Sequence, residues 1–239
     1  YVAAVNSTNI IIRNVNLTDN GQGIVLVNSK NCLIENSFIT KMGYYAIQLV
    51  NADDNTISNN NITSNRPPYF GVGIAVQRDS TGNTIRNNII QNNELGILFY
   101  NSGANIIYHN NFIGNAEQVD SIGSTNIWDS GYPSGGNYWS NYAGTDEKSG
   151  SDQAIPGKDG IGDTPHIIDE TNRDRYPFMS MIPKESGNAT ISIDPTEVLI
   201  EIAIIVAVTV LACFLGTRTR ASKKLEKISI EKPVAAAEK

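Results

Sequence analysis

Three aspartates in one glycine-rich stretch have the types and spacing of a calcium loop. Asp152, Asp159 and Asp163 lie close together, and the segment Asp-Gly-Ile-Gly-Asp at residues 159–163 places flexible backbone carbonyls between two carboxylates. Calcium is bound by six to eight such oxygens. We therefore predict calcium as the cofactor that this chain could bind, the alternative being a solvated acidic loop.

Carboxylate pairs could also cleave polysaccharides. Glycoside hydrolases use two carboxyl groups about 5–9.5 Å apart. Asp53 and Asp54 are neighbours in a turn, while Glu94 and Glu117 fall within one position of equivalent places in adjacent repeats. No set of residues combines an acid, a base and a cation site, so a polysaccharide-cleaving or -modifying enzyme is the alternative to a non-catalytic function.

Sugar recognition without cleavage needs only polar groups and exposed rings. The segments between the apolar positions are rich in Asn, Thr, Ser and Asp, and they carry Tyr44, Tyr45, Tyr69, Phe70 and Tyr100. Four Asn-x-Ser/Thr motifs are possible glycosylation sites; their asparagines are Asn6, Asn16, Asn61 and Asn188.

The elements that position these residues come from an internal repeat with a period of about 22–23 residues. Three apolar columns recur once per repeat, and glycine or alanine usually precedes the third column. The columns are Ile12, Ile34, Ile57, Ile85 and Ile107; Leu17, Ile39, Ile62, Ile90 and Phe112; and Ile24, Ile47, Ile74, Ile97 and Val119.

Short apolar runs between Asn and Gly exclude helical repeats, and Asn-x-Ile-x-x-Asn-x-Ile differs from the leucine-rich pattern. Three short strands per repeat predict an all-β, right-handed parallel β-helix of about five coils. Residues 2–7 match residues 24–29, so we expect the coils of residues 1–125 to be truncated at their N-terminal end.

Asparagines recur beside the first apolar column in the last three repeats. Asn tolerates left-handed backbone angles, and stacked side-chain amides can hydrogen-bond from coil to coil. We predict that they form a structural ladder rather than a ligand site; its members are Asn55, Asn83, Asn105, Asn60, Asn88 and Asn110.

Composition changes after the repeats. Residues 126–182 hold both tryptophans among Gly, Pro and Asp, which predicts an irregular cap over the open end of the coils. A spacer (183–197) follows, and residues 198–216 are apolar apart from Glu201, long enough for one transmembrane helix. The basic tail 217–239 then predicts a cell-membrane protein with a single span, an extracellular or periplasmic N-terminal domain and a cytoplasmic tail.

The charge distribution argues against nucleic acid as a partner. The chain has 18 basic and 24 acidic residues, and residues 217–239 hold seven of the basic ones against three Glu. Residues 1–197 therefore carry 11 basic and 20 acidic groups, a net charge of −9. Such a domain lacks the Lys/Arg surface that phosphate binding requires.

Two motifs after the repeats resemble a known family. Gly-Gly-Asn-Tyr-Trp-Ser at 135–140 and Asp-Gly-Ile-Gly-Asp-Thr-Pro at 159–165, closed by Tyr176-Pro177, are similar to NosD-like right-handed β-helix proteins over about residues 2–179. The resemblance implies repeats of the carbohydrate-binding and sugar-hydrolase type. For the founding members it also implies a periplasmic, copper-associated role in nitrous oxide reductase maturation.

Copper needs clustered cysteine, histidine or methionine. The possible ligands in this chain are scattered; they are Cys32, Met42, His109, His166, Met179 and Met181. Copper-linked maturation therefore ranks behind the other two functions. The sequence favours a membrane-anchored β-helix protein with a binding or structural role, toward glycans or other envelope components.

Overall fold

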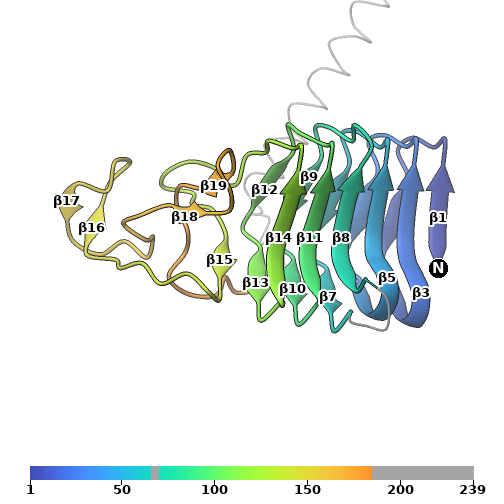
Figure 1. Ribbon diagram of the computed structural model, residues 1–239, viewed down its shortest axis with the longest axis horizontal. Coiled ribbons are helices and arrows are strands. Elements are labelled where there is room, and N and C mark those ends of the chain that lie inside the picture. Colours follow the sequence, from blue (N-terminus) through green and yellow to red (C-terminus); the bar gives the residue numbers. More distant parts are fainter. Residues whose placement is uncertain (66–69, 185–239) are drawn as a thin grey trace, which may run out of the picture. The chain divides into compact units, whose positions relative to one another are not determined.

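The computed structural model describes residues 1–65 and 70–184, which belong to one compact unit, Tyr1–Ser186 (Figure 1). The predicted membrane helix, the basic tail, Asn188 and all but the first two residues of the spacer lie outside the described residues. Within the described ranges, no helix is long and apolar enough to span a membrane.

The described residues form an all-β parallel solenoid of about six turns, one more than predicted, because Val2–Val5 already pairs as a strand. One face of each turn contributes to a long sheet, on the near side in Figure 1. Its strands are β1 (Val2–Val5), β3 (Asn16–Val27), β5 (Phe38–Val50), β8 (Val72–Gln77), β11 (Leu95–Tyr100) and β14 (Glu117–Ile122).

Two further rows of short strands complete each turn. The first halves of β3 and β5 bend into a second face, where the same sheet continues through β7 (Asn61–Thr63), β10 (Ile89–Gln91), β13 (Asn111–Ile113) and β15 (Tyr138–Trp139). The third face is a separate sheet of β2 (Ile11–Arg13), β4 (Leu33–Glu35), β6 (Thr56–Ser58), β9 (Thr84–Arg86) and β12 (Ile106–Tyr108).

The strand register confirms the parallel repeat. Ile34 pairs with Ile12 and Ile57, Ile90 with Ile62 and Phe112, and Ile97 with Ile74 and Val119, as the three apolar columns require. Most members of these columns are fully buried, so each turn adds at least three apolar side chains to one continuous core. A Cβ at Gly73 would lie 2.6 Å from the Gly96 carbonyl oxygen, so close coil stacking explains the small residues before the third column.

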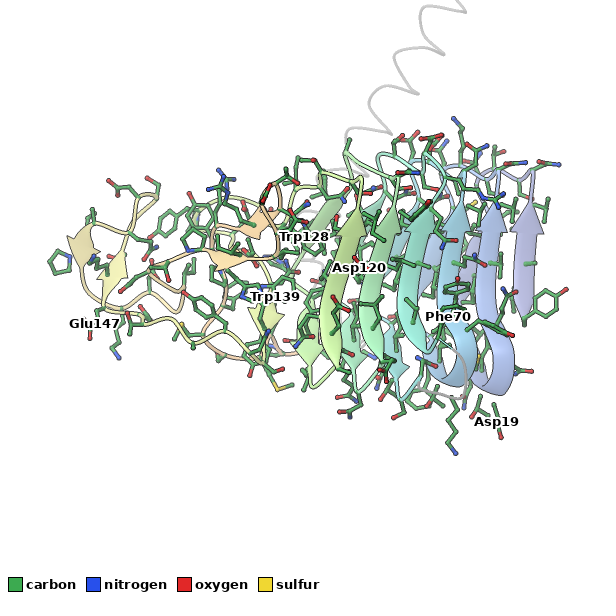
Figure 2. All side chains as sticks on the ribbon, in the orientation of Figure 1. Asp19, Phe70, Asp120, Trp128, Trp139 and Glu147 are labelled. Carbon is green, nitrogen blue, oxygen red and sulfur yellow. The ribbon has the colours of Figure 1, made fainter. Side chains whose placement is uncertain are left out.

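Residues 126–182 cover the last turn with loops, with β15 and with four further short strands, β16 (Lys148–Ser149), β17 (Ile155–Pro156), β18 (His166–Ile167) and β19 (Arg173–Asp174). Two tryptophans close the core at this end (Figure 2). Trp139 stacks on Phe112 with ring centroids 4.2 Å apart, and Trp128 meets Phe99 edge-on at 5.8 Å. Both indoles are 1% exposed, so the apolar interior of the last coil is shielded from water at the cap.

Candidate functional site

The six asparagines predicted to stack occupy two buried columns, each next to a corner of the coils. Each is at most 1% exposed. In every link the backbone N–H and the side-chain Nδ2 of one asparagine donate to the Oδ1 of the next, as Asn88 does to Asn110 at 3.0 Å for both bonds. The columns are Asn55–Asn83–Asn105 and Asn60–Asn88–Asn110.

The same amides also bond to the preceding coil. Asn110 Nδ2 donates to the Ile85 carbonyl oxygen at 2.8 Å, and Asn83 Nδ2 donates to the Ala52 oxygen at 2.9 Å. Each ladder residue thus links three successive coils, and its polar atoms are satisfied inside the protein. These contacts give the ladder a structural role.

The second ladder ends on a carboxylate in the cap, which the sequence did not reveal. Asn137, from the Gly-Gly-Asn-Tyr-Trp motif, follows Asn110 in the column and donates its N–H to Asp174 Oδ2 at 2.6 Å. Trp139 Nε1 donates to the same oxygen at 2.9 Å, and the Tyr176 N–H donates to Oδ1 at 3.1 Å. Asp174 is fully buried, and its carboxyl group ends the column by accepting hydrogen bonds from all three of these donors.

The first ladder ends in a matching way. Asn105 donates to Asn126 Oδ1, and the Asn126 N–H donates to Asn172 Oδ1 at 2.9 Å. Trp128 Nε1 donates to that oxygen at 3.0 Å, as Trp139 does at the end of the other ladder. The cap motifs therefore continue both ladders and fix both tryptophans.

Two further buried columns were missed. A third asparagine ladder runs through Asn65, Asn93 and Asn115, and a serine ladder runs through Ser80, Ser102 and Ser124. The third ladder repeats the interval of five residues that already separates the first two, as in Asn55, Asn60 and Asn65. That interval is the signal from which it could have been predicted.

The ladder asparagines do not occupy the left-handed positions that we expected of them. The residue immediately before each ladder position has positive φ instead: Asp54 (56°), Asn59 (57°), Gly82 (67°), Asn87 (57°), Ala104 (56°) and His109 (57°). That residue turns the chain, and the next one directs its amide inward to bond. The corner and the ladder are separate positions, so the abundant asparagine serves two purposes.

The three predicted calcium aspartates lie in the cap loops. Asp152 is exposed; Asp159 Oδ1 accepts from the Ile161 N–H at 3.0 Å; Asp163 accepts from the N–H groups of Glu147 and Lys148. Burial works against ionisation of Asp163, but the N–H donors outweigh it and hold the pKa of its carboxyl below the usual value. Within residues 1–65 and 70–184, no group of three or more His, Cys, Asp or Glu is arranged to hold a metal ion.

Calcium binding in these loops stays a prediction. Gln153 is 8% exposed, its Oε1 is buried without a hydrogen-bond partner, and its Nε2 lies 3.4 Å from Asp159 Oδ2. An amide oxygen and a carboxylate are calcium ligands. If calcium at about a hundred times its dissociation constant stabilises the cap, chelation lowers the melting temperature by about 5–10 °C. The D159N variant should lose this response, and a wild-type melting temperature that a chelator leaves unchanged would rule out the site.

The possible glycosylation sites differ in accessibility. Asn6 and Asn16 are exposed, although Asn6 Oδ1 accepts from Asn28 Nδ2 at 3.0 Å. Asn61 is half-buried in β7, and its Oδ1 is buried without a partner. Of the three described positions, Asn6 and Asn16 are therefore the accessible ones.

A groove of about 540 Å³ lies on the outer face of the long sheet, across β5, β8, β11 and β14. The strand register builds it from rows of outward side chains, one residue from each strand. One row is Tyr45, Val72, Leu95 and Glu117, and another ends in Tyr100 and Ile122. Phe70 and Asp120, labelled in Figure 2, also line it.

The groove combines rings, apolar side chains and acids. Phe70 is 63% exposed and Tyr100 is 46% exposed, which leaves their faces available to a ligand. The acids Glu94, Glu117 and Asp120 line the same groove, and its described lining includes no Lys or Arg. The rings can therefore pack against a flat apolar face of a ligand, and the carboxylates can accept hydrogen bonds from polar groups of the same ligand.

A second hollow of about 500 Å³ adjoins the groove where β14 meets the cap. The two share Ala116 and Glu117 in their lining. His166 lines the second hollow and stacks on Trp139 with ring centroids 4.4 Å apart. Burial lowers the pKa of the His166 imidazole, which favours its neutral form. An extended ligand in the groove would meet this neutral ring at the cap end.

Comparison with known families gives one match. Residues 2–144 match the model of a family described as "Periplasmic copper-binding protein (NosD)". The matched stretch is more than half of the 239 residues, and it contains every strand from β1 to β15. Comparisons with curated proteins and with solved structures found no match.

Proposed function

This chain belongs to the NosD family, and from that premise we propose that it is an exported β-helix protein that binds glycans of the cell envelope in its outer groove. The family is described as periplasmic, which agrees with an N-terminal domain outside the cytoplasm. We further propose, from the sequence alone, that the coils are right-handed and that residues 198–216 anchor the protein in the membrane.

The exposed rings of the groove are the observation that carries this proposal. Phe70 and Tyr100 are exposed and Tyr45 is half-buried; Tyr45 lies on β5, Phe70 just before β8 and Tyr100 on β11. Sugar rings have flat C–H faces that pack on aromatic rings, and their hydroxyl groups donate to carboxylates such as Glu117. The groove crosses successive strands, which are about 4.8 Å apart, so its long direction runs along the coil axis. It would therefore fit a ligand that extends along that axis.

The second candidate is an enzyme that cleaves or modifies a polysaccharide. The observation that favours it is the presence of three carboxylates, Glu94, Glu117 and Asp120, in the groove that would hold the sugar. An acid and a base on either side of a glycosidic bond are what hydrolysis requires. Such an enzyme would release new reducing ends or unsaturated products.

Copper binding, which the family description names, does not fit the described residues. Cys32 and Met42 are buried in the coils, and Cys32 fills the position that precedes Asn55 in its ladder. His109 Nε2 is 2.7 Å from the Ser134 oxygen, while His166 lies stacked on Trp139. Within the part of the chain that the structure describes, these cysteine, methionine and histidine side chains do not form a group, so we assign copper no part in the function.

A glycan array probed with the full chain tests the proposal. We expect saturable binding, and Y100A should weaken it about fivefold to tenfold because one stacking face is lost. Tyr1, 76% exposed and outside the groove, gives the matched control Y1A, which should bind as wild type does. Products released from the bound glycan would favour the enzyme, and equal binding by both variants would refute the groove as the site.

A further inference from the structure

We propose that the outer groove selects glycans that carry free amino groups, which are cationic when protonated. This inference rests on the proposed function and deepens it by naming the ligand class. Three carboxylates meet the ligand along the groove, from Glu94 before β11 to Glu117 and Asp120 on β14. Charge complementarity of this kind determines which ligands a site accepts.

The three acids are not neutralised by neighbouring basic side chains. Among the described residues, the two ion pairs are Lys30–Asp53 at 2.9 Å and Arg175–Asp129 at 2.7 Å, both outside the groove. Glu94 and Glu117 are exposed, and Asp120 is half-buried. The negative charge of the three carboxylates is therefore available to interact with a ligand in the groove.

The surrounding protein strengthens this preference. Residues 1–197 carry a net charge of −9, so an anionic polysaccharide such as a polyuronate is repelled both by the groove and by the domain around it. A neutral sugar would pack on the rings but leave the carboxylates with hydroxyl partners only. An ammonium group would give them charge-assisted hydrogen bonds, which are the stronger kind.

The backbone of the groove favours a glycan over a cationic peptide. Strands β5, β8 and β11 are each paired on both sides, so over most of the groove the N–H and C=O groups are occupied, and among the described strands of the groove only β14, which pairs with β11 alone, has an open edge. An extended peptide needs a free sheet edge to satisfy its own backbone. A sugar needs only side chains, which this face supplies as rings and carboxylates.

The experiment compares three oligosaccharides of equal length by calorimetry with the full chain: chitosan, its N-acetylated counterpart and oligogalacturonate. At mildly acidic pH we expect chitosan to bind about tenfold tighter than the acetylated form, because exposed ion pairs are weak singly but add when several meet one ligand. Added salt should remove most of this difference, and oligogalacturonate should bind weakest.

The double variant E117Q/D120N should bind chitosan only as tightly as it binds the acetylated form. Its affinity for the acetylated form should equal that of wild type. Asp19, an exposed acid outside the groove, provides the control D19N, which should keep the preference. Equal binding of the amino and acetylated sugars would overturn this inference and leave glycan binding standing. An oligomer of lysine is the cationic peptide control. If it bound as tightly as chitosan does, selection for a sugar would be overturned. If no glycan bound at all, the proposed function itself would be overturned.

Discussion

Replacing Asn110 with alanine is expected to lower the free energy of unfolding by about 4 kcal/mol or more. The change removes the acceptor of two Asn88 donors and the donor to the carbonyl oxygens of Ile85 and Tyr108, all at a site with no exposure. Each buried polar group left without a partner costs about 1–3 kcal/mol. Denaturant unfolding of the full chain measures the loss, and a melting temperature lower by roughly 10 °C should accompany it.

The control for this substitution is an asparagine of the same coils outside the ladders. Asn16 is exposed in β3, and N16A should change the free energy of unfolding by less than about 0.5 kcal/mol. N110D would keep the size of the side chain but remove its donors, and we expect it to be destabilising as well. If N110A and N16A were equally mild, the ladder would contribute little to stability.

The second large effect is a pH dependence that arises at Asp174. Burial raises the pKa of this carboxyl from 3.8 to about 7, although the N–H donors from Trp139, Asn137 and Tyr176 oppose the shift. The folded protein therefore holds a proton at Asp174 between about pH 4 and pH 7, where the unfolded chain has released it. The stabilising contribution is full below the unfolded pKa and is lost as pH rises through about 7, on the order of 4 kcal/mol in all.

Unfolding of wild type and D174N, followed from pH 4 to pH 8, isolates this titration. The amide of D174N does not ionise, so the stability difference between the two proteins should shrink as pH rises. Groups that do not interact with Asp174, such as Asp53 beside Lys30, titrate alike in both proteins and cancel in the comparison. Parallel profiles would show that Asp174 keeps one protonation state throughout this range.

The sequence was sufficient to predict the coils because every turn has the same packing requirement. Every turn must supply an apolar side chain to each of three faces, so Ile34, Ile57 and Ile85 could be aligned by period alone, and the strand register confirms that alignment. The ladder positions follow the same period. The left-handed corners keep this period too, but no residue type marks them, because Asp54, Gly82 and Ala104 share a backbone angle without sharing a residue type.

The groove and the ends of the ladders could not be read in this way. Asn137 follows Asn110 by 27 residues, and Asp174 lies a further 37 residues along, in loops without a period. Glu117 and Asp120 are three residues apart, and only the register of β11 and β14 places them with Tyr100. Charged and aromatic residues on an outer face obey no packing rule, so their grouping becomes visible only in three dimensions.

The ladders make the coils interchangeable. Each turn that carries a ladder asparagine offers its successor the same N–H donors and its predecessor the same Oδ1 acceptor, so the contact between two such turns does not depend on their place in the series. Whole repeats can therefore be gained or lost in evolution, lengthening or shortening the solenoid in steps of about 4.8 Å. The cap needs to match only the final turn, through Asn137, Asn172 and Asp174. The span of the groove, and with it the number of sugar units it can hold, can thus change while the chemistry that closes the end of the protein stays constant.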